Sequence, residues 1–339
     1  MQLNTPERLE QANATAHKTY EFDDEHNDRR PADWWFQESV EGTVLFIVFY
    51  SQACRWSLCT GCNLPSVGSK RHVGWRSLVA QVDWLLSEPD IASKSDEIRK
   101  VIVSNNGSVL DEDTFSTVAL MYLLAQLMLR FPVLHAVSLE TRAEYVDLAE
   151  LEFLSRAIKE GASPAETEIA IGFEAFDDHI RNKEFLKGLS LEAFEEMVER
   201  VAGTHLRLKC YFMQKPVVTM TDEEAVIDVQ RGIDYLSEVS LKHKVPINIH
   251  LNPTYVASGT PLESAFREGK FWPPRLLDVV RAVVHSKDKP ISVFVGLNDE
   301  GLAVEGGGVV RPGEDWIADI IETFNRTQDY APLERLLRA

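Results

Sequence analysis

Short apolar runs alternate with longer amphipathic patterns along most of this chain of 339 residues. The short runs are rich in Val, Ile, Leu and Phe, and polar or turn-forming residues bound them, which predicts buried β-strands. They lie at 43–50, 100–105, 135–140, 168–174, 206–213 and 247–252. One more run, at 291–297, predicts either a further strand or a docked closing segment.

Between these runs, apolar residues recur at helical spacing. The clearest case is the segment 114–130, where Leu120, Leu123, Leu124 and Leu127 fall on one face of the predicted helix. Similar patterns predict helices at 75–86, 148–160, 190–201, 222–243 and 274–285.

The alternation of strands and helices predicts an α/β fold. Strands separated by helices form right-handed βαβ units and a parallel sheet, and nearly continuous apolar strands indicate that both faces of this sheet are covered. Six repeats are too few for a complete eight-stranded barrel, so they favour an open, partial barrel or a doubly wound sheet. We expect an N-terminal extension at 1–42, the barrel at 43–298 and a C-terminal segment at 299–339, whose glycine-rich loop at 301–310 lies over the mouth.

Composition and charge narrow the possible partners. The net charge of −18 is spread along the chain, which disfavours a polyanionic substrate unless a local basic patch overrides it. The chain contains no run of about 18 apolar residues, so we expect no membrane span. The first thirty residues are acidic and lack an apolar core, so we expect neither a signal nor a transit peptide, and a cytoplasmic location.

Three cysteines directly follow the first predicted strand. Cys54, Cys59 and Cys62 deliver three thiols to one loop, and thiolates suit zinc or an iron–sulfur cluster with one iron left open. A zinc site would need His72 as its fourth ligand, although zinc sites usually present paired motifs. A redox disulfide of the last two cysteines would leave the first without a role. The loop's position favours the cluster, and Cys210 is predicted to be an inert buried thiol.

Polar residues follow the other strands where a parallel sheet places its active site. The candidates are Asn105, Asn106 and Gly107 after the second strand, Glu140 and Arg142 after the third, and Glu174 with Arg181 after the fourth. Taken singly, the asparagines would also make a plain turn, and the two glutamates would also cap the following helices. Their shared register at the strand ends favours a site.

Other residues carry weaker signals. Lys209 faces either the barrel interior or the solvent, and His250 is more simply a satisfied core histidine. The pair Trp34-Trp35 is predicted to pack across the base of the barrel.

The cysteine loop, the polar turn and the acidic strand ends together resemble the radical S-adenosylmethionine superfamily. The cysteines here are separated by four and then two residues, whereas common members of that family have three and then two. The phrases NNGSVLD, SLETRAEYVD, AIGFEAFDDHIRNKEFLKGL, KCYFMQKP and LNPTYVASGTPLE are similar to radical enzymes that act in archaeosine formation on tRNA and to their bacterial relatives. The resemblance implies a partial (β/α)6 barrel.

The resemblance also implies cofactors and roles. Cys54, Cys59 and Cys62 would hold one [4Fe–4S] cluster, whose open iron binds S-adenosylmethionine and cleaves it to a 5′-deoxyadenosyl radical. Asn105, Asn106 and Gly107 would bind the methionyl amino group, and Glu140 and Glu174 a ribose hydroxyl or the same ammonium. Arg142 or Arg181 would pair with the methionyl carboxylate. An external donor of flavodoxin or ferredoxin type would supply the electron.

Four hypotheses about the function remain open from the sequence. The acidic charge favours a radical enzyme that abstracts hydrogen from a small-molecule substrate, in a rearrangement or lyase reaction. The resemblance offers a radical lyase acting on a modified tRNA nucleoside. From other classes come a non-catalytic zinc-stabilised scaffold and a domain that binds S-adenosylmethionine for polar methyl transfer. Without a second cysteine cluster, reactions that need an auxiliary cluster in the same chain are excluded.

Overall fold

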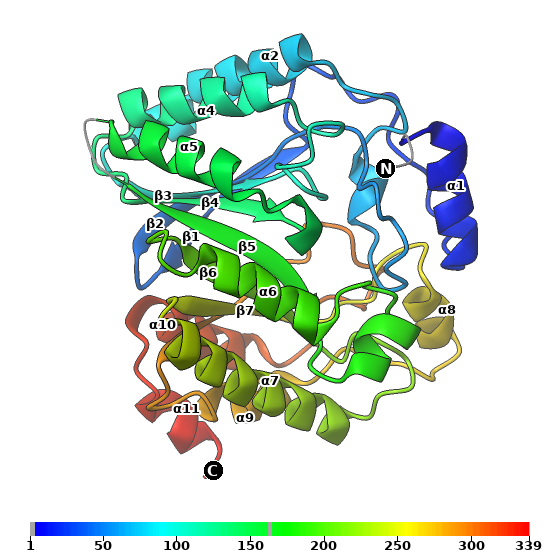
Figure 1. The fold of residues 1–339 in the computed structure, drawn as a ribbon. Coiled ribbons are helices and arrows are strands. Elements are labelled where there is room, and N and C mark those ends of the chain that lie inside the picture. The colour runs from blue at the N-terminus through cyan, green and yellow to red at the C-terminus, as the bar shows by residue number, and fades with distance from the viewer. Residues whose placement is uncertain (1–3, 162–164, 339) are drawn as a thin grey trace.

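The chain forms one curled sheet wrapped on its outer side by helices (Figure 1). The computed structural model describes residues 4–161 and 165–338. The strands are β1 (Asp33–Ser39), β2 (Gly42–Val48), β3 (Ile98–Ser104), β4 (Ala136–Thr141), β5 (Glu166–Glu174), β6 (Arg207–Gln214), β7 (Ile247–Pro253) and β8 (Ile291–Val295).

The helices connect successive strands or flank the sheet. They are α1 (Pro6–Thr15), α2 (Trp75–Ser87), α3 (Pro89–Ser93), α4 (Thr117–Arg130), α5 (Leu148–Lys159), α6 (Leu191–Val201), α7 (Asp222–His243), α8 (Pro261–Arg267), α9 (Leu276–Val284), α10 (Asp315–Thr327) and α11 (Ala331–Leu336). Shorter turns are η1 (Leu64–Val67), η2 (Ala143–Tyr145) and the π-helical η3 (Ile180–Glu184).

Strand order decides between the two predicted α/β architectures. The strands are paired in chain order from β1 to β8, and every pair from β2 to β8 is parallel. A doubly wound sheet would reverse its order at a switch point, whereas steps in one direction curl the sheet into a partial barrel. The predicted partial barrel is therefore confirmed, and the run at 291–297 supplies a strand, β8.

One strand was missed because its pattern is mostly polar. Strand β1 lies within the predicted extension, and it pairs antiparallel with β2 through a tight turn. Its Trp35 stacks on Phe46 of β2 with ring centroids 4.3 Å apart. The adjacent tryptophans therefore belong to the sheet itself.

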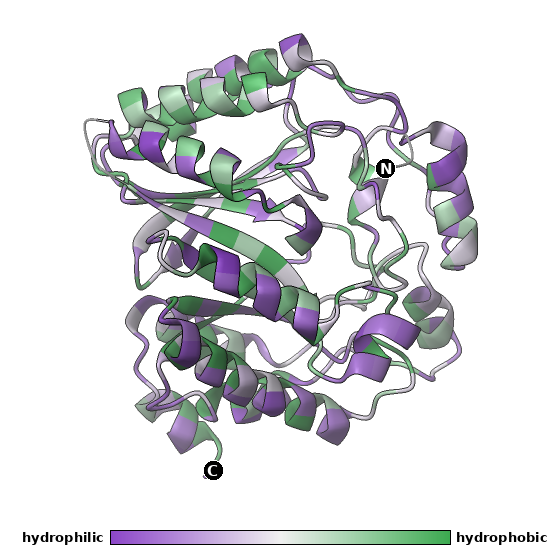
Figure 2. Cartoon of the chain, viewed as in Figure 1, coloured by the Kyte–Doolittle hydropathy of each residue, from purple (hydrophilic) through white to green (hydrophobic). Residues whose placement is uncertain are grey.

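The core lies between the outer helices and the convex face of the sheet. Figure 2 shows hydrophilic residues along the outer sides of α6 and α7, whose apolar residues, such as Phe194 and Ile233, are buried. Within residues 4–161 and 165–338, no helix combines the length and the apolar character needed to cross a lipid bilayer.

The amino-terminal end of the barrel is closed by buried charges. Glu168 lies 2.8 Å from Lys100, 3.0 Å from Arg207 and 3.7 Å from Lys209. Burial opposes the ionisation of Glu168, but these three cations keep its pKa below the ordinary value. Lys209 therefore points inward, where it belongs to this ion network rather than to the wall of the main cavity.

Helix α10 covers the outer edge of β8. The side-chain amide of Asn325 donates to the carbonyl of Val295 and accepts from its N–H, each at 2.9 Å. Gln328 donates to the carbonyl of Val293 at 2.9 Å. The same helix contacts β1, so it lies beside both end strands of the sheet.

Candidate active site

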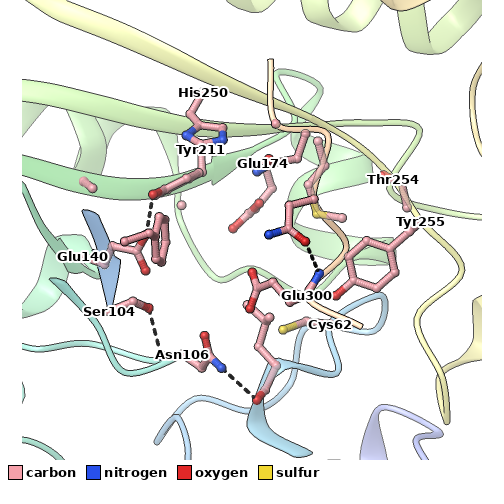
Figure 3. A pocket seen from close by; sticks show the side chains of 18 of the residues that line it. Cys62, Ser104, Asn106, Glu140, Glu174, Tyr211, His250, Thr254, Tyr255 and Glu300 are labelled. Atoms are coloured by element: carbon pink, nitrogen blue, oxygen red, sulfur yellow. Dashed lines mark hydrogen bonds between the residues drawn. The ribbon is translucent and has the colours of Figure 1, made fainter. Parts of the chain in front are cut away.

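A cavity of about 720 Å³ lies inside the curled sheet and opens at the carboxyl ends of its parallel strands. Residues from the cysteine loop, from all of the strands β1 to β8, and from the loops after β3 and β8 line it. Figure 3 shows side chains from these separate elements turned toward one another around the open space. The location matches the site expected for a parallel α/β sheet.

All three clustered cysteines line this cavity. Cys54, Cys59 and Cys62 are half-buried free thiols. Their loop is fixed from outside by Trp56, whose indole N–H donates to the carbonyl of Leu186 at 2.7 Å. This contact holds the cysteine loop against the segment before Gly188.

A buried lysine fixes the same loop from its other side. Lys18, which follows α1, donates to the carbonyl of Ser57 at 2.8 Å, and its Nζ lies 3.5 Å from the carbonyls of Cys59 and Cys62. Only 6% of this side chain is exposed. The N-terminal segment thereby brings a positive charge next to the cysteines, which the sequence pattern did not predict.

Burial raises the pKa of two of these thiols. The pKa of Cys62 rises to about 12, and burial also raises that of Cys59, although Lys187 and Arg142 partly oppose this effect. A bound cation is what releases the protons of such thiols, because metal ligation requires the thiolate. Binding of a metal group at this loop would therefore release protons from these thiols.

The arrangement fits a cluster better than a single zinc ion. Among the described residues, no three or more His, Cys, Asp or Glu side chains are grouped closely enough to hold one metal ion. His72 is exposed and its Nδ1 lies 3.2 Å from the carbonyl of Asp113, outside the cavity. A [4Fe–4S] cluster takes one thiolate on each of three irons, so its ligands converge on a larger body than one ion.

The turn after β3 packs directly against the first cysteine. Asn106 and Gly107 line the cavity, and a Cβ atom on Gly107 would lie 3.1 Å from the Cα of Cys54. Asn105 is buried behind them, where its side chain donates to Ser51 at 3.1 Å and accepts from the N–H of Gly107 at 3.1 Å. Asn105 therefore stabilises the turn, whereas Asn106 and Gly107 are the residues of the turn that line the cavity.

Two carboxylates from the strand ends reach the cavity with different partners. Glu140 of β4 accepts a hydrogen bond from the hydroxyl of Tyr211, and burial raises its pKa. Glu174 of β5 forms an ion pair with Lys187 at 2.7 Å. Gly172 makes room for this pair, because a Cβ atom there would lie 2.2 Å from Nζ of Lys187.

Only one of the two candidate arginines lines the cavity. Arg142 donates to Glu144 at 2.5 Å and to the carbonyl of Lys187 at 3.1 Å, and its guanidinium lies 4.6 Å from the ring centroid of Trp56. Arg181 is fully buried elsewhere. Its guanidinium donates to the carbonyls of Leu189, Ala175 and Phe176 and to Asp178, at 2.6 to 2.8 Å. Arg181 thus holds the chain around η3.

Further cavity residues were not predicted as site residues. Lys187 lies within the phrase AIGFEAFDDHIRNKEFLKGL, next to Gly188, whose positive φ of 70° lets the chain pass close to Trp56. Glu300 reaches the cavity from the loop after β8. His250 lines the cavity, and its buried Nδ1 has no hydrogen-bond partner among the described residues, so it is not the satisfied core histidine expected from the sequence.

Sequence relatives span almost the whole chain. An archaeosine synthase subunit beta of Methanosarcina acetivorans is 25% identical over 309 residues, which cover 89% of this chain and 85% of that protein. The predicted resemblance is confirmed. An uncharacterized protein of Methanocaldococcus jannaschii is 22% identical and covers 88% of this chain and 82% of its own length. No family model matches the chain.

Similarity to solved structures is weaker. The archaeal Elp3 of Methanocaldococcus infernus, with an N-terminal deletion, gives a TM-score of 0.49 at 14% identity. The match covers 75% of this chain and 59% of that one. The chain therefore spans less than two thirds of Elp3.

Proposed function

We propose that this chain is a radical S-adenosylmethionine enzyme. The observation that carries the proposal is that Cys54, Cys59 and Cys62 line one cavity together with the polar turn after β3, which packs against Cys54, and with the ends of β4 and β5. In this proposal the three cysteines hold a [4Fe–4S] cluster. When bound, that cluster supplies the electron that cleaves S-adenosylmethionine to a 5′-deoxyadenosyl radical, which abstracts hydrogen from the substrate.

The remaining residues bind and orient the cosubstrate. Asn106 and Gly107 offer backbone and amide groups to the methionyl amino group. Arg142 is the guanidinium at the cavity wall, so we assign it rather than Arg181 to the methionyl carboxylate. Glu174, held in place by Lys187, accepts a hydrogen bond from a ribose hydroxyl or from the ammonium.

The sequence-based division of the chain is kept in this proposal. Residues 43–298 form the catalytic barrel, the extension at 1–42 adds Lys18 and β1 to it, and the segment at 299–339 covers the mouth and the edge of β8. We propose a cytoplasmic enzyme that takes its electron from a flavodoxin or ferredoxin type of donor.

The test uses protein reconstituted with iron and sulfide in the absence of oxygen. We expect about four irons per chain and 5′-deoxyadenosine on addition of dithionite and S-adenosylmethionine. Single Cys→Ala variants at 54, 59 and 62 should lose both. Cys210→Ala is the matched control, because Cys210 is fully buried in β6 away from the cavity and should keep both. Protein that binds one zinc and no iron would refute the proposal in favour of a scaffold.

For the substrate we propose a small molecule, with a modified tRNA nucleoside as the second candidate. The net charge of −18 supports the first, and the similarity to an archaeosine synthase subunit supports the second. Binding of tRNA measured across a salt series separates them, because phosphate contacts give a steep decline in affinity with salt. A steep decline would favour the nucleoside, and the absence of binding would favour the small molecule.

A further inference from the structure

A carboxylate on the loop after β8 faces the cavity without a cationic partner. Glu300 is half-buried and lines the cavity. Among the described residues, no lysine, arginine or histidine forms an ion pair with it, and nothing donates a hydrogen bond to its side chain. Figure 3 shows its carboxylate pointing toward the middle of the cavity, between Tyr255 and Asn106.

The loop that carries Glu300 is firmly attached to the rim of the cavity. Asn63, next to the last cysteine, donates to the carbonyl of Leu302 at 2.9 Å, and Ala257 pairs with Ala303 in an isolated β-bridge. Glu300 itself has a φ of 55°, and its N–H donates to the side chain of Asn298 at 2.9 Å. The backbone therefore holds this carboxylate over the cavity.

The cations of the cavity wall are engaged elsewhere. Lys187 pairs with Glu174, Arg142 pairs with Glu144, and Lys18 binds the carbonyls of the cysteine loop. Of the other lining cations, Lys94 lies over the ring of Phe36, with its Nζ 4.3 Å from the centroid, and Arg326 donates to Thr323.

The groups that do face Glu300 are acids and phenols. Burial, with Glu140 of β4, Asp33 of β1 and Asp299 of its own loop, raises the pKa of Glu300 to about 8. The charge of Glu300 in turn helps to raise the pKa of Tyr211 of β6 and that of Tyr255 after β7. Within residues 4–161 and 165–338, the ionised carboxylate of Glu300 thus has no counter-charge.

Two buried side chains in the same cavity each have a polar atom that forms no hydrogen bond with any part of the chain that the structure describes. Thr254, which is 1% exposed, has an unpaired Oγ1, and His250, which is 5% exposed, has an unpaired Nδ1. Both line the cavity with Glu300. Burial, together with Lys209 and Lys100, keeps the pKa of His250 well below its ordinary value, so its imidazole is neutral and one ring nitrogen is an acceptor. Buried polar atoms without partners at this depth indicate a polar ligand, and both of these atoms can accept a hydrogen bond from its N–H groups.

We infer that Glu300 is the counter-ion for a cationic nitrogen of the substrate, a primary ammonium or an amidinium, with Thr254 and His250 as further acceptors for its N–H groups. This inference rests on the proposed function, since it takes the methionyl end of S-adenosylmethionine to be bound by Asn106, Glu174 and Arg142. The substrate is thus a small amine or amidine.

The probes are four compounds of equal chain length: 1-butylamine, butanamidine, 1-butanol and butyrate. Their binding to the reconstituted protein is measured by ligand-observed NMR, and that of S-adenosylmethionine by calorimetry. We expect the two cations to bind at least about tenfold more tightly than the alcohol, and butyrate not to bind. Glu300→Gln should weaken the cations by about 10- to 100-fold while S-adenosylmethionine affinity stays within about twofold.

Two variants act as controls. Glu305→Gln changes an exposed glutamate on the same loop, outside the cavity, and should leave every affinity unchanged. Thr254→Val keeps the shape of the side chain and should weaken the cations alone, which supports the site if Glu300→Gln fails to fold.

Equal binding of amine and alcohol would overturn the inference. So would equal losses of amine and S-adenosylmethionine affinity in Glu300→Gln, because Glu300 would then serve the cosubstrate. Failure of the proposed function is read separately, as missing iron or missing 5′-deoxyadenosine, and amine binding is measured independently of either.

Discussion

Replacing Lys18 by methionine tests how the N-terminal segment supports the cysteine loop. The side chain is 6% exposed, donates to the carbonyl of Ser57 at 2.8 Å, and lies 3.5 Å from two cysteine carbonyls. Methionine has nearly the same length and no polar hydrogen, so Lys18→Met removes the charge and the donor without leaving a large void.

The contacts give two magnitudes. A hydrogen bond from a charged group contributes about 1.5–3 kcal/mol, so the cluster-free protein should melt roughly 3–6 °C lower. If the charge gained on reduction is taken to lie about 7 Å from the ammonium, the Coulomb energy at an effective dielectric constant of about 20 is about 2.4 kcal/mol. For a one-electron couple this corresponds to about 100 mV.

The sign follows from the charge of the cluster. Reduction adds an electron, which the nearby ammonium stabilises, so the midpoint potential of Lys18→Met should fall by about 100 mV. Potentiometric titration followed by electron paramagnetic resonance measures this value. Lys270→Met is the control, because that side chain is 69% exposed and its loss should change neither stability nor potential appreciably. An unchanged or higher potential in Lys18→Met would refute the reasoning.

Two further substitutions test other parts of the site. Gly172→Ala puts a Cβ atom 2.2 Å from Nζ of Lys187 and 2.3 Å from Oε1 of Glu174, so calorimetry should show S-adenosylmethionine binding at least about tenfold weaker; Gly74→Ala, with no atom within 4 Å, should bind normally. Since the pKa of Glu300 is raised from 4.5 to about 8, the folded protein keeps a proton that the unfolded chain releases, and this group makes stability fall as pH rises through that window. The melting temperature of Glu300→Gln relative to that of the native protein should therefore rise between about pH 5 and pH 8 and stay constant above pH 8. A difference in melting temperature that does not change with pH would contradict the raised pKa of Glu300.

The sequence predicted the strands of the barrel well because both of their faces are buried. Continuous apolar runs such as 43–50 and 100–105 carry that signal alone, and they match β2 and β3 closely. Strand β1 was missed because Asp33, Gln37 and Glu38 interrupt its apolar residues, and its pairing depends on the turn into β2. Its identity as a strand comes from its partner rather than from its own composition.

Some residues of the candidate site could likewise be predicted from the sequence, and others could not. Residues at the carboxyl ends of strands, such as Glu140 and Glu174, could be predicted because strand direction alone carries them to the cavity. Lys18 and Glu300 could not, since each reaches the cavity through a loop whose path depends on contacts distant in sequence. Arg181 was favoured by its position after β5, but the π-helical turn around it directs the guanidinium to backbone carbonyls.

The amides of Asn325 and Gln328 have a consequence for the state of the molecule in solution. An open parallel sheet ends in a strand whose free N–H and C=O groups attract strands of other molecules. Here a helix supplies side-chain amides that satisfy β8 at Val293 and Val295. The partial barrel therefore needs no neighbouring copy of the chain to cover β8, because Asn325 and Gln328 already satisfy the polar groups of Val293 and Val295.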